Sequence, residues 1–249
     1  MRAREIEQTR ASFDYQWSRL PPAEWSLANP EFRERVATDI CSLCGLAPEW
    51  FAGRSVLDAG CGTGRFAYGF CRLGARVTAI DRSAIVLRTV QTACGPFEGF
   101  AGAIAADLLT PLPLDQQFDL VWSYGVLHHT GDTRTAFGHV ARHVAPGGYL
   151  LVMLYGAPRS GQLDDYRRAV SWEAWRCRCR EMSFDEKAAA LGPIASPARL
   201  LEHFDTISPW INDRHSFDEV QAWFTEEGFV NLRRPIDDMD LYLVAQRAG

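Results

Sequence analysis

The segment that most limits the fold of this chain is 56–66, which reads VLDAGCGTGRF. It places three glycines, Gly60, Gly62 and Gly64, at alternate positions directly after a short apolar run. Glycine has no Cβ atom, so this spacing lets the backbone turn tightly and approach a ligand closely. The residues that follow, 66–73, have the pattern of a helix. The segment therefore predicts a strand, a ligand-binding turn and a helix in succession.

The same alternation of strand and helix continues along the chain. We expect strands at 55–58, 76–80, 102–106, 118–123 and 149–154, and a closing pair at 229–236 and 240–246. We expect helices between them at 66–73, 84–93 and 133–143, with others at 30–44 and 216–228. Strands that alternate with helices indicate a parallel sheet with crossover helices. The pattern predicts an α/β fold with a doubly wound, mostly parallel seven-stranded sheet and an antiparallel C-terminal strand.

The length of 249 residues fits one elaborated α/β domain. We divide it into an N-terminal helical lid (1–50), a ligand-binding core (51–155), a helical cap insertion (156–215), and a C-terminal helix with strands that complete the sheet (216–249). Within the core, Pro146-Gly-Gly148 is expected to form the turn before the fifth strand.

Composition narrows the function. The net charge is −5, and 47% of the residues are apolar. A broad phosphate-binding surface needs a basic excess, so we expect no nucleic-acid partner. No run is long and apolar enough to cross a bilayer, and no apolar segment follows the charged N-terminus. We expect a cytoplasmic protein without membrane contact, either a monomer or a homodimer.

The seven cysteines suggest two alternatives. Cys41 and Cys44 form a C-x-x-C, and Cys177 and Cys179 form a C-x-C, so together they can be read as a four-thiolate zinc site. Both pairs, however, fall in segments with helical spacing and without the glycines of a zinc knuckle. We therefore expect reduced cysteines packed as small apolar residues, and no metal.

Three acids follow or end the first three expected strands. Asp58 precedes the first glycine by two residues, Asp81 ends the second strand, and Asp107 follows the third. The spacing G-x-G-x-G differs from the G-x-G-x-x-G that seats a pyrophosphate, and an acid beside it suits a ligand carrying an ammonium group. Asp81 can accept hydrogen bonds from both ribose hydroxyls of a nucleoside, and Asp107 from an exocyclic amine.

At these residues the chain resembles the class I S-adenosylmethionine-dependent methyltransferase superfamily. The segment 58–64 matches its first motif, Asp81 its ribose-binding acid, Asp107 its adenine-side acid, and 118–123 its fourth strand. The resemblance implies a Rossmann-like fold with S-adenosylmethionine as cofactor and S-adenosylhomocysteine as product. It also implies in-line transfer of a methyl group to an acceptor, to which the protein contributes alignment and desolvation.

The resemblance extends to a set of expected cofactor contacts. Aromatic residues near the N-terminus, Tyr15 and Trp17 among them, are expected to fold over the cofactor and stabilise its sulfonium by cation–π attraction; plain helix packing is the alternative. The full expected cofactor-binding set is Asp58, Gly60, Cys61, Gly62, Gly64, Asp81, Arg82, Asp107, Leu108, Ser123, Tyr124, Gly125, Tyr15 and Trp17.

The sequence says less about the residues that bind the acceptor or act as a base. His128 and His129 follow the fourth strand and are candidate bases, with His128 favoured; a structural histidine bound to the backbone is the alternative. In the segment 210–215, Arg214 can bind a carboxylate or phosphate, and His215 can serve as a base, unless the segment is a solvated loop. Residues expected to bind the substrate are Trp210, Asn212, Arg214 and Tyr155.

Together these features predict a methyltransferase acting on a small-molecule acceptor, in biosynthesis of a secondary metabolite. O-methylation is favoured, and N- and C-methylation remain open. Two other functions are considered: methylation of tRNA or protein, which a basic groove beside the glycines would support, and a relative that binds S-adenosylmethionine without methylating.

Overall fold

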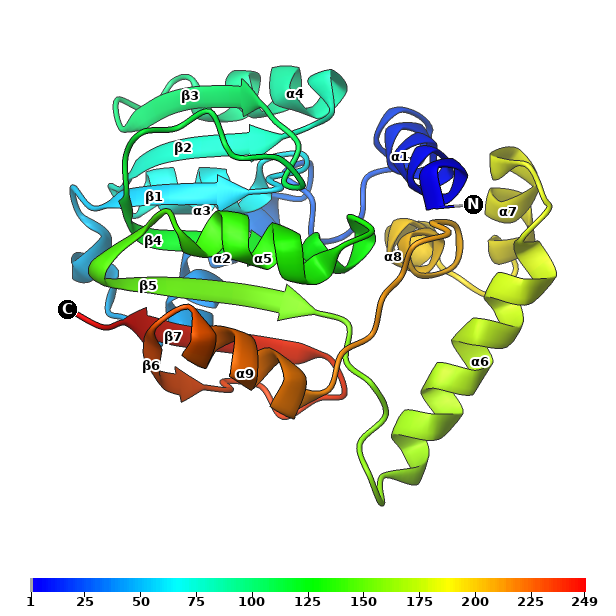
Figure 1. Cartoon of the computed structure of the whole chain (residues 1–249). Helices are drawn as coiled ribbons and strands as arrows, with labels where there is room; N and C mark the ends of the chain where they lie inside the picture. The colour runs from blue at the N-terminus through cyan, green and yellow to red at the C-terminus, as the bar shows by residue number, and fades with distance from the viewer. Residues whose placement is uncertain (1) are drawn as a thin grey trace.

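A computed structural model describes residues 2–249 and shows one seven-stranded sheet in the order β3-β2-β1-β4-β5-β7-β6 (Figure 1). The strands are β1 (Ser55–Ala59), β2 (Arg76–Asp81), β3 (Phe100–Ala105), β4 (Phe118–Tyr124), β5 (Val144–Leu154), β6 (Phe229–Arg233) and β7 (Leu241–Arg247). β1 to β5 pair in parallel, β7 is antiparallel to β5, and β6 is antiparallel to β7. The predicted doubly wound, mostly parallel sheet is confirmed.

Helices cover both faces of the sheet and one of its edges. They are α1 (Arg2–Arg19), α2 (Pro30–Cys44), α3 (Arg65–Arg72), α4 (Ala84–Cys94), α5 (Thr133–Ala141), α6 (Leu163–Cys179), α7 (Phe184–Leu191), α8 (Pro197–Ile207) and α9 (Phe217–Glu226), with short 3₁₀ turns η1 (Pro48–Phe51) and η2 (Leu127–His129). α2, α3 and α4 pack on one face, and α5 and α9 on the other. Because both faces are covered, the central strands are apolar on both sides, as in Leu120-Val121-Trp122 of β4, which is fully buried.

The fifth strand differs from the expectation. It begins at Val144 rather than at residue 149, so Pro146-Gly-Gly148 lies inside β5 and does not precede it. The pairing with β4 jumps from Phe118 opposite Val144 to Leu120 opposite Tyr149, which leaves extra residues on β5. Gly147 has φ +74°, a left-handed conformation that glycine adopts without strain. The expected turn is therefore a bulge that interrupts a longer strand.

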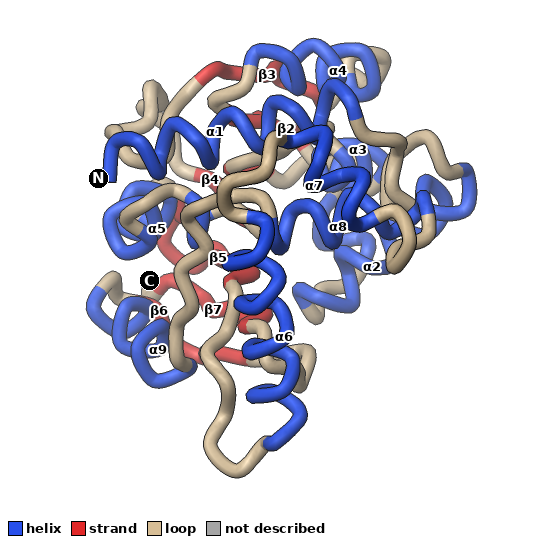
Figure 2. Tube along the Cα trace, turned by 90° about the vertical axis from the view of Figure 1, so that its right-hand side faces the viewer, coloured by secondary structure: helices blue, strands red, loops and turns tan. Residues whose placement is uncertain are grey.

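The remaining helices form a separate layer beyond the carboxyl ends of the parallel strands. Figure 2 shows α1, α7 and α8 crossing in front of the strands, with α6 beside them. Cys179, Leu191, Phe204 and Ile207 form a small buried cluster in this layer, and Tyr15 of α1 packs against it. The N-terminal helix and the helices of 156–215 thus share one apolar cluster.

Hydrogen bonds join the two parts of this layer. The Ser12 hydroxyl donates to the Ser208 hydroxyl at 2.7 Å, and the Gln8 amide donates to the Ser208 carbonyl at 2.9 Å. The backbone N–H of Ile211 donates to the Thr9 hydroxyl at 2.9 Å. α1 and the segment after α8 are therefore fixed to each other above the strand ends. Along residues 2–249, no helix combines the length and the hydropathy needed to span a membrane.

Candidate functional site

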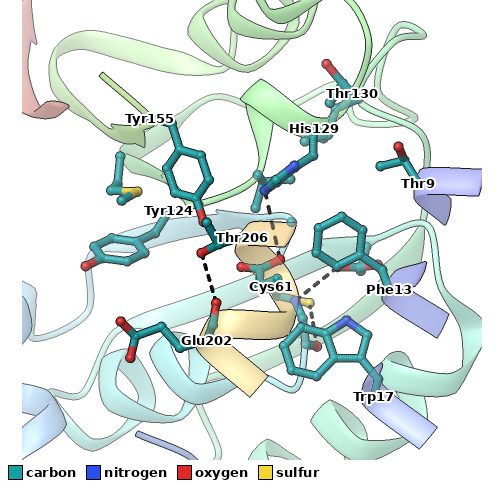
Figure 3. A pocket seen from close by; sticks show the side chains of 18 of the residues that line it. Thr9, Phe13, Trp17, Cys61, Tyr124, His129, Thr130, Tyr155, Glu202 and Thr206 are labelled. Atoms are coloured by element: carbon teal, nitrogen blue, oxygen red, sulfur yellow. Dashed lines mark hydrogen bonds and ion pairs between the residues drawn. The ribbon is translucent and has the colours of Figure 1, made fainter. Parts of the chain in front are cut away.

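In Figure 1, α1 and α8 lie beyond the carboxyl ends of the strands. Residues of the strand ends, α1 and α8 line a cavity of about 540 Å³. Its volume is within the range of roughly 300–1,000 Å³ that is usual for small-molecule sites. This is the edge at which open α/β sheets bind ligands, because the loops that follow parallel strands converge there. Figure 3 shows side chains from both sides meeting in the cavity, with Trp17 of α1 beside Cys61 and with Phe13 facing His129.

The glycine loop forms one wall of the cavity. Gly60, Gly62 and Gly64 all have positive φ, at +82°, +51° and +82°. A Cβ atom built on Gly60 would lie 2.5 Å from the side chain of Val126, so this position has no room for a side chain. Trp17 lies against Gly62, 3.5 Å from where a Cβ atom would stand. Gly60 and Gly62 line the cavity, whereas Gly64 does not, and a Cβ atom on Gly64 would lie 2.9 Å from the side chain of Val90.

Asp58 lies one residue before the end of β1 and borders the cavity. Its side chain is 2% exposed, and its Oδ2 atom has no hydrogen-bond partner within residues 2–249. Burial raises the pKa of this carboxyl to about 7, while the backbone N–H of Ala67 and the charge of Arg65 act in the opposite direction. A buried carboxyl oxygen without a partner is costly, so its retention indicates a cationic or hydrogen-bonding ligand beside it.

Asp81 holds the glycine loop in place and still faces the cavity. Its Oδ2 accepts from the backbone N–H of Gly62 at 3.0 Å, and its Oδ1 accepts from that of Ser83 at 2.9 Å. A carboxylate has about four lone-pair directions, so each oxygen can accept one further hydrogen bond. Asp81 can therefore bind two hydroxyls while it anchors the loop.

Asp107 is more engaged than expected. Its carboxylate is paired with Arg10 of α1, and its Oδ1 accepts from the backbone N–H of Leu109 at 3.0 Å. Arg10, Asp107 and the neighbouring Leu108 all line the cavity, as does Arg82. The N-terminal helix thus meets the third acid directly, a contact that the sequence did not predict.

Two residues expected at the cofactor have other partners. The Ser123 hydroxyl is fully buried and donates to the Ala59 carbonyl at 2.9 Å, which ties β4 to β1. The Tyr15 hydroxyl donates to Asp185 at 2.6 Å, and its ring stacks on Phe204 with centroids 5.4 Å apart. Neither residue is among those that line the cavity, because each is turned into packing between elements. The other expected cofactor residues that line it are Trp17, Cys61, Tyr124 and Gly125.

The two adjacent histidines occupy different environments. His129 lines the cavity, and its Nδ1 lies 2.8 Å from the Ile211 carbonyl, so Nδ1 carries the proton and Nε2 is left with its lone pair. His128 is fully buried, stacks on Tyr155 with ring centroids 4.0 Å apart, and does not line the cavity. Burial lowers the pKa of both, that of His129 to about 4. Of the two histidines, His129 alone lines the cavity within residues 2–249.

Asp205 of α8 is a site residue that the sequence analysis missed. Its Oδ1 lies 3.9 Å from Nε2 of His129, and neither atom has a hydrogen-bond partner within residues 2–249. Burial raises the pKa of Asp205 to about 7, although the charge of Arg65 opposes the shift. No motif marks this aspartate, because only the packing of α8 over the strand ends brings it to the cavity.

The segment 210–215 contributes one expected residue to the cavity. Arg214 lines it, donates to the Gly156 carbonyl at 3.0 Å, and lies beside Tyr155, which also lines it. The other three lie outside the lining: Trp210 stacks with Arg4 and Arg180, Asn212 donates to the Thr206 carbonyl, and the His215 ring pairs with Glu219. These three side chains hold the segment in position.

The cysteine pairs lie on different helices, Cys41 and Cys44 on or at the end of α2, and Cys177 and Cys179 on α6. All seven cysteines are free thiols. Within residues 2–249, no three histidine, cysteine, aspartate or glutamate side chains gather closely enough to hold a metal ion.

Comparison with known proteins agrees with this arrangement. Residues 57–152 match the family model described as a methyltransferase domain. A demethylmenaquinone methyltransferase of Tropheryma whipplei is 32% identical over 191 residues, which cover 77% of this chain and 71% of that one. An uncharacterized methyltransferase of Mycobacterium tuberculosis is 41% identical over 107 residues, covering 41% of this chain and 51% of that one. The chain therefore spans about half the length of the latter relative.

Solved structures share the fold. The magnesium protoporphyrin IX methyltransferase of Synechocystis PCC 6803, solved with S-adenosylhomocysteine, matches over all of both chains with a TM-score of 0.61 and 16% identity. The N-methyltransferase NodS of Bradyrhizobium japonicum matches 97% of this chain and 100% of that chain, with a TM-score of 0.58 and 17% identity. The sheet, the matched domain and a relative aligned over more than two thirds of both chains agree, and this chain belongs to the class I S-adenosylmethionine-dependent methyltransferase family.

Proposed function

We propose that this protein transfers a methyl group from S-adenosylmethionine to a hydroxyl of a small-molecule acceptor inside the cavity. The observation that carries the proposal is the convergence of Asp58, Asp81 and the bare glycine loop on one enclosed space at the strand ends. When bound, S-adenosylmethionine supplies an electrophilic methyl group on a positively charged sulfur. The residues of the chain bind the cofactor, orient the acceptor, exclude water and accept a proton.

The residues around the loop fit this cofactor. Asp58 offers a buried carboxyl oxygen without a partner, which suits an ammonium group. Asp81 keeps unused lone pairs for two hydroxyls, and the glycine loop leaves room for a close approach of the ligand. Trp17 and Phe13 of α1 present aromatic rings to the same cavity, and such rings stabilise a cation.

His129 is the group that suits a hydroxyl acceptor. Its Nδ1 proton is committed to the Ile211 carbonyl, so Nε2 is the atom that can accept a proton. The pKa of about 4 keeps the ring neutral at neutral pH, as a base must be. The 3.9 Å between Nε2 and Asp205 Oδ1 places the carboxyl group beside the nitrogen that accepts the proton. Asp205 in its ionised form stabilises the imidazolium that results. Positioned bases of this kind contribute about 10²- to 10⁴-fold to a rate.

A small acceptor is supported by the position of the cavity, which α1 and α8 partly cover. Its volume of about 540 Å³ lies in the range usual for small-molecule sites. With a net charge of −5, the chain has no overall basic excess for a nucleic acid. Among relatives, a malonyl-[acyl-carrier protein] O-methyltransferase of Salmonella typhimurium (31% identical over 160 residues, 64% of this chain and 59% of that one) methylates oxygen by its name. These points support O-methylation in small-molecule biosynthesis.

The test has two stages. Calorimetry with S-adenosylhomocysteine should give one site per chain. Incubation with methyl-labelled S-adenosylmethionine and matched panels of hydroxylated, aminated and methylene-activated small molecules should then label a hydroxylated acceptor. Label in bulk tRNA or protein, or cofactor binding with no transfer to any panel, would contradict the proposal. Absence of cofactor binding would remove its basis.

A further inference from the structure

Arginines dominate the cations of the cavity, and all but one of them are paired. Those that line it are Arg10, Arg65, Arg82, Arg168, Arg199 and Arg214. Five lie within 4 Å of a carboxylate: Arg10 of Asp107, Arg82 of Asp14, Arg168 of Asp238, Arg199 of Glu202, and Arg214 of Asp240. Within residues 2–249, the guanidinium of Arg65 alone among the six has neither a carboxylate at that distance nor a hydrogen-bond partner.

Aromatic rings surround this unpaired guanidinium. Its central carbon lies 4.1 Å from the ring centroid of Trp25, 4.6 Å from that of Phe66 and 5.3 Å from that of Tyr124. Ring faces attract a cation, but they accept no strong hydrogen bonds, so the five N–H donors of the guanidinium remain available. Burial lowers the pKa of Arg65, although the charges of Asp58 and Asp205 oppose the shift.

The position of Arg65 places this cation at the cofactor side of the cavity. It is the first residue of α3 and follows Gly64 directly. Asp58, whose Oδ2 has no partner, borders the same cavity, and its charge acts on Arg65 from beyond 4 Å. Arg65, Trp25, Phe66 and Tyr124 also line an adjoining groove of about 390 Å³. An anion can therefore reach the guanidinium from the cavity or through the groove.

We propose that Arg65 is the carboxylate-binding residue of this site. The aromatic side chains around it hold the guanidinium in place for a bidentate ion pair. The inference rests on the proposed function and deepens it. Two carboxylates have the required chemistry: that of the amino-acid part of the cofactor, whose ammonium would lie toward Asp58, and one carried by the acceptor. Guanidinium–carboxylate pairs are commonly bidentate, which gives both affinity and orientation.

The experiment compares the demethylated cofactor with a fragment that lacks its amino-acid end, and with it the carboxylate and the ammonium. Calorimetry is run with S-adenosylhomocysteine and with 5′-methylthioadenosine, which keeps the nucleoside and the thioether. The proteins are the full chain, Arg65→Met, Arg65→Lys, and Arg88→Met as the matched control, since Arg88 is exposed on α4. A bound cofactor carboxylate predicts that Arg65→Met lowers the affinity for S-adenosylhomocysteine by about 10- to 100-fold, as expected for a charge-assisted pair.

The ratio of the two affinities is the decisive quantity, because partial unfolding of a variant lowers both together. Arg65→Lys should give an intermediate ratio, and Arg88→Met the ratio of the unaltered chain. If the ratio is unchanged in Arg65→Met, the acceptor carboxylate is tested next by titrating benzoate and benzamide onto the S-adenosylhomocysteine complex. The carboxylate is assigned to the acceptor if the unaltered chain binds benzoate better than benzamide and Arg65→Met loses that preference.

Two results separate the inference from its basis. If the unaltered chain binds S-adenosylhomocysteine, but Arg65→Met keeps both the affinity ratio and any preference for benzoate, the assignment of Arg65 is wrong and the proposed function stands. The assignment is equally wrong if the ratio is unchanged and the unaltered chain shows no preference for benzoate. If the unaltered chain does not bind S-adenosylhomocysteine at all, the proposed function itself fails.

Discussion

The imidazole Nε2 of His129 and the carboxyl Oδ1 of Asp205 lie 3.9 Å apart, and neither atom has another partner within residues 2–249. The pair joins the sheet, through η2 after β4, to the helical layer, through α8. Burial lowers the pKa of His129 to about 4 and raises that of Asp205 to about 7. Near neutral pH the histidine is therefore neutral, and the aspartate changes its charge.

This pairing predicts a pH dependence. As pH rises through about 7, Asp205 loses its proton, and its charge stabilises the imidazolium that forms when His129 accepts a proton. We therefore expect kcat/KM to rise across this range. Asp205→Asn should reduce the rise, leaving the part due to Asp58, whose pKa is also about 7, and lower the rate above pH 8 by about 10-fold, the scale of one pKa unit of lost charge stabilisation. Rates from pH 5.5 to 9 measure both. The same rise in Asp205→Asn would show that another group titrates.

The two histidines should respond differently to substitution. His129→Ala removes the Nε2 lone pair, which has no hydrogen-bond partner in the described residues, so we expect kcat to fall by about 100-fold or more while the affinity for S-adenosylhomocysteine stays within a few-fold. His128→Gln perturbs a buried side chain outside the cavity, so its main effect should be a lower thermal stability, with a smaller loss of kcat than in His129→Ala. Steady-state kinetics, calorimetry and melting curves test this, and equal kcat losses in both variants would speak against the assignment.

In the absence of a ligand, the buried carboxyl of Asp58 should lower the free energy of unfolding as it ionises at rising pH. Its pKa in the folded chain is about 7, against an ordinary value of 3.8, so the unfolded chain releases this proton first as pH rises. Stability contributed by the protonated form is therefore lost between about pH 4 and pH 7. Asp58→Asn should remove this loss and gain at most about 4 kcal/mol at pH 8, with little gain at pH 4. Urea unfolding at both values measures it. A destabilisation independent of pH would contradict the expectation.

Two glycines with similar φ allow crowding to be separated from backbone strain. A Cβ on Gly60, at φ +82°, would stand 2.5 Å from Val126, whereas one on Gly53, at φ +72°, would meet nothing within 4 Å. Both substitutions by alanine carry a strain of about 1 kcal/mol. Gly60→Ala should cost about 1–3 kcal/mol more, because of the clash. Adding Val126→Ala should recover part of that excess. Equal costs for Gly60→Ala and Gly53→Ala would show that the loop yields freely.

Substitutions of Asp81 and Ser123 should differ in their effect on cofactor affinity. Asp81→Ala removes the carboxylate that anchors Gly62 and faces the cavity, so the affinity for S-adenosylhomocysteine should fall by about 10- to 100-fold. Ser123→Ala removes the hydroxyl that donates to the Ala59 carbonyl, so it should cost about 1 kcal/mol of stability and leave that affinity unchanged. Calorimetry and urea unfolding measure both. A large loss of affinity in Ser123→Ala would restore it to the cofactor site.

The sequence predicted the fold and the strand-end acids because both depend on local patterns. Asp58 and Asp81 follow from the position at which an apolar run ends. Ser123 shows the limit: it lies one residue before the end of β4, and successive side chains of a strand face opposite sides, so a shift of one position decides its role.

What could not be predicted depends on contacts between distant segments. Arg10 pairs with Asp107, 97 residues later, and Asp205 reaches the cavity only because α8 packs beside α1. Nothing in the amphipathic pattern of α8 distinguishes an aspartate that faces a cavity from one that faces water. The sequence likewise does not reveal that Arg65, unlike the other arginines of the cavity, has no carboxylate of residues 2–249 within 4 Å.

The bonds from Ser12 to Ser208 and from Ile211 to Thr9 have a consequence for traffic through the protein. α1 covers the glycine loop, and α8 carries Asp205, which lies beside His129. The two hydrogen bonds link α1 to the segment that follows α8. Moving one helix without the other would break these bonds. We therefore expect α1 and α8 to move together if the cavity opens to exchange cofactor and acceptor.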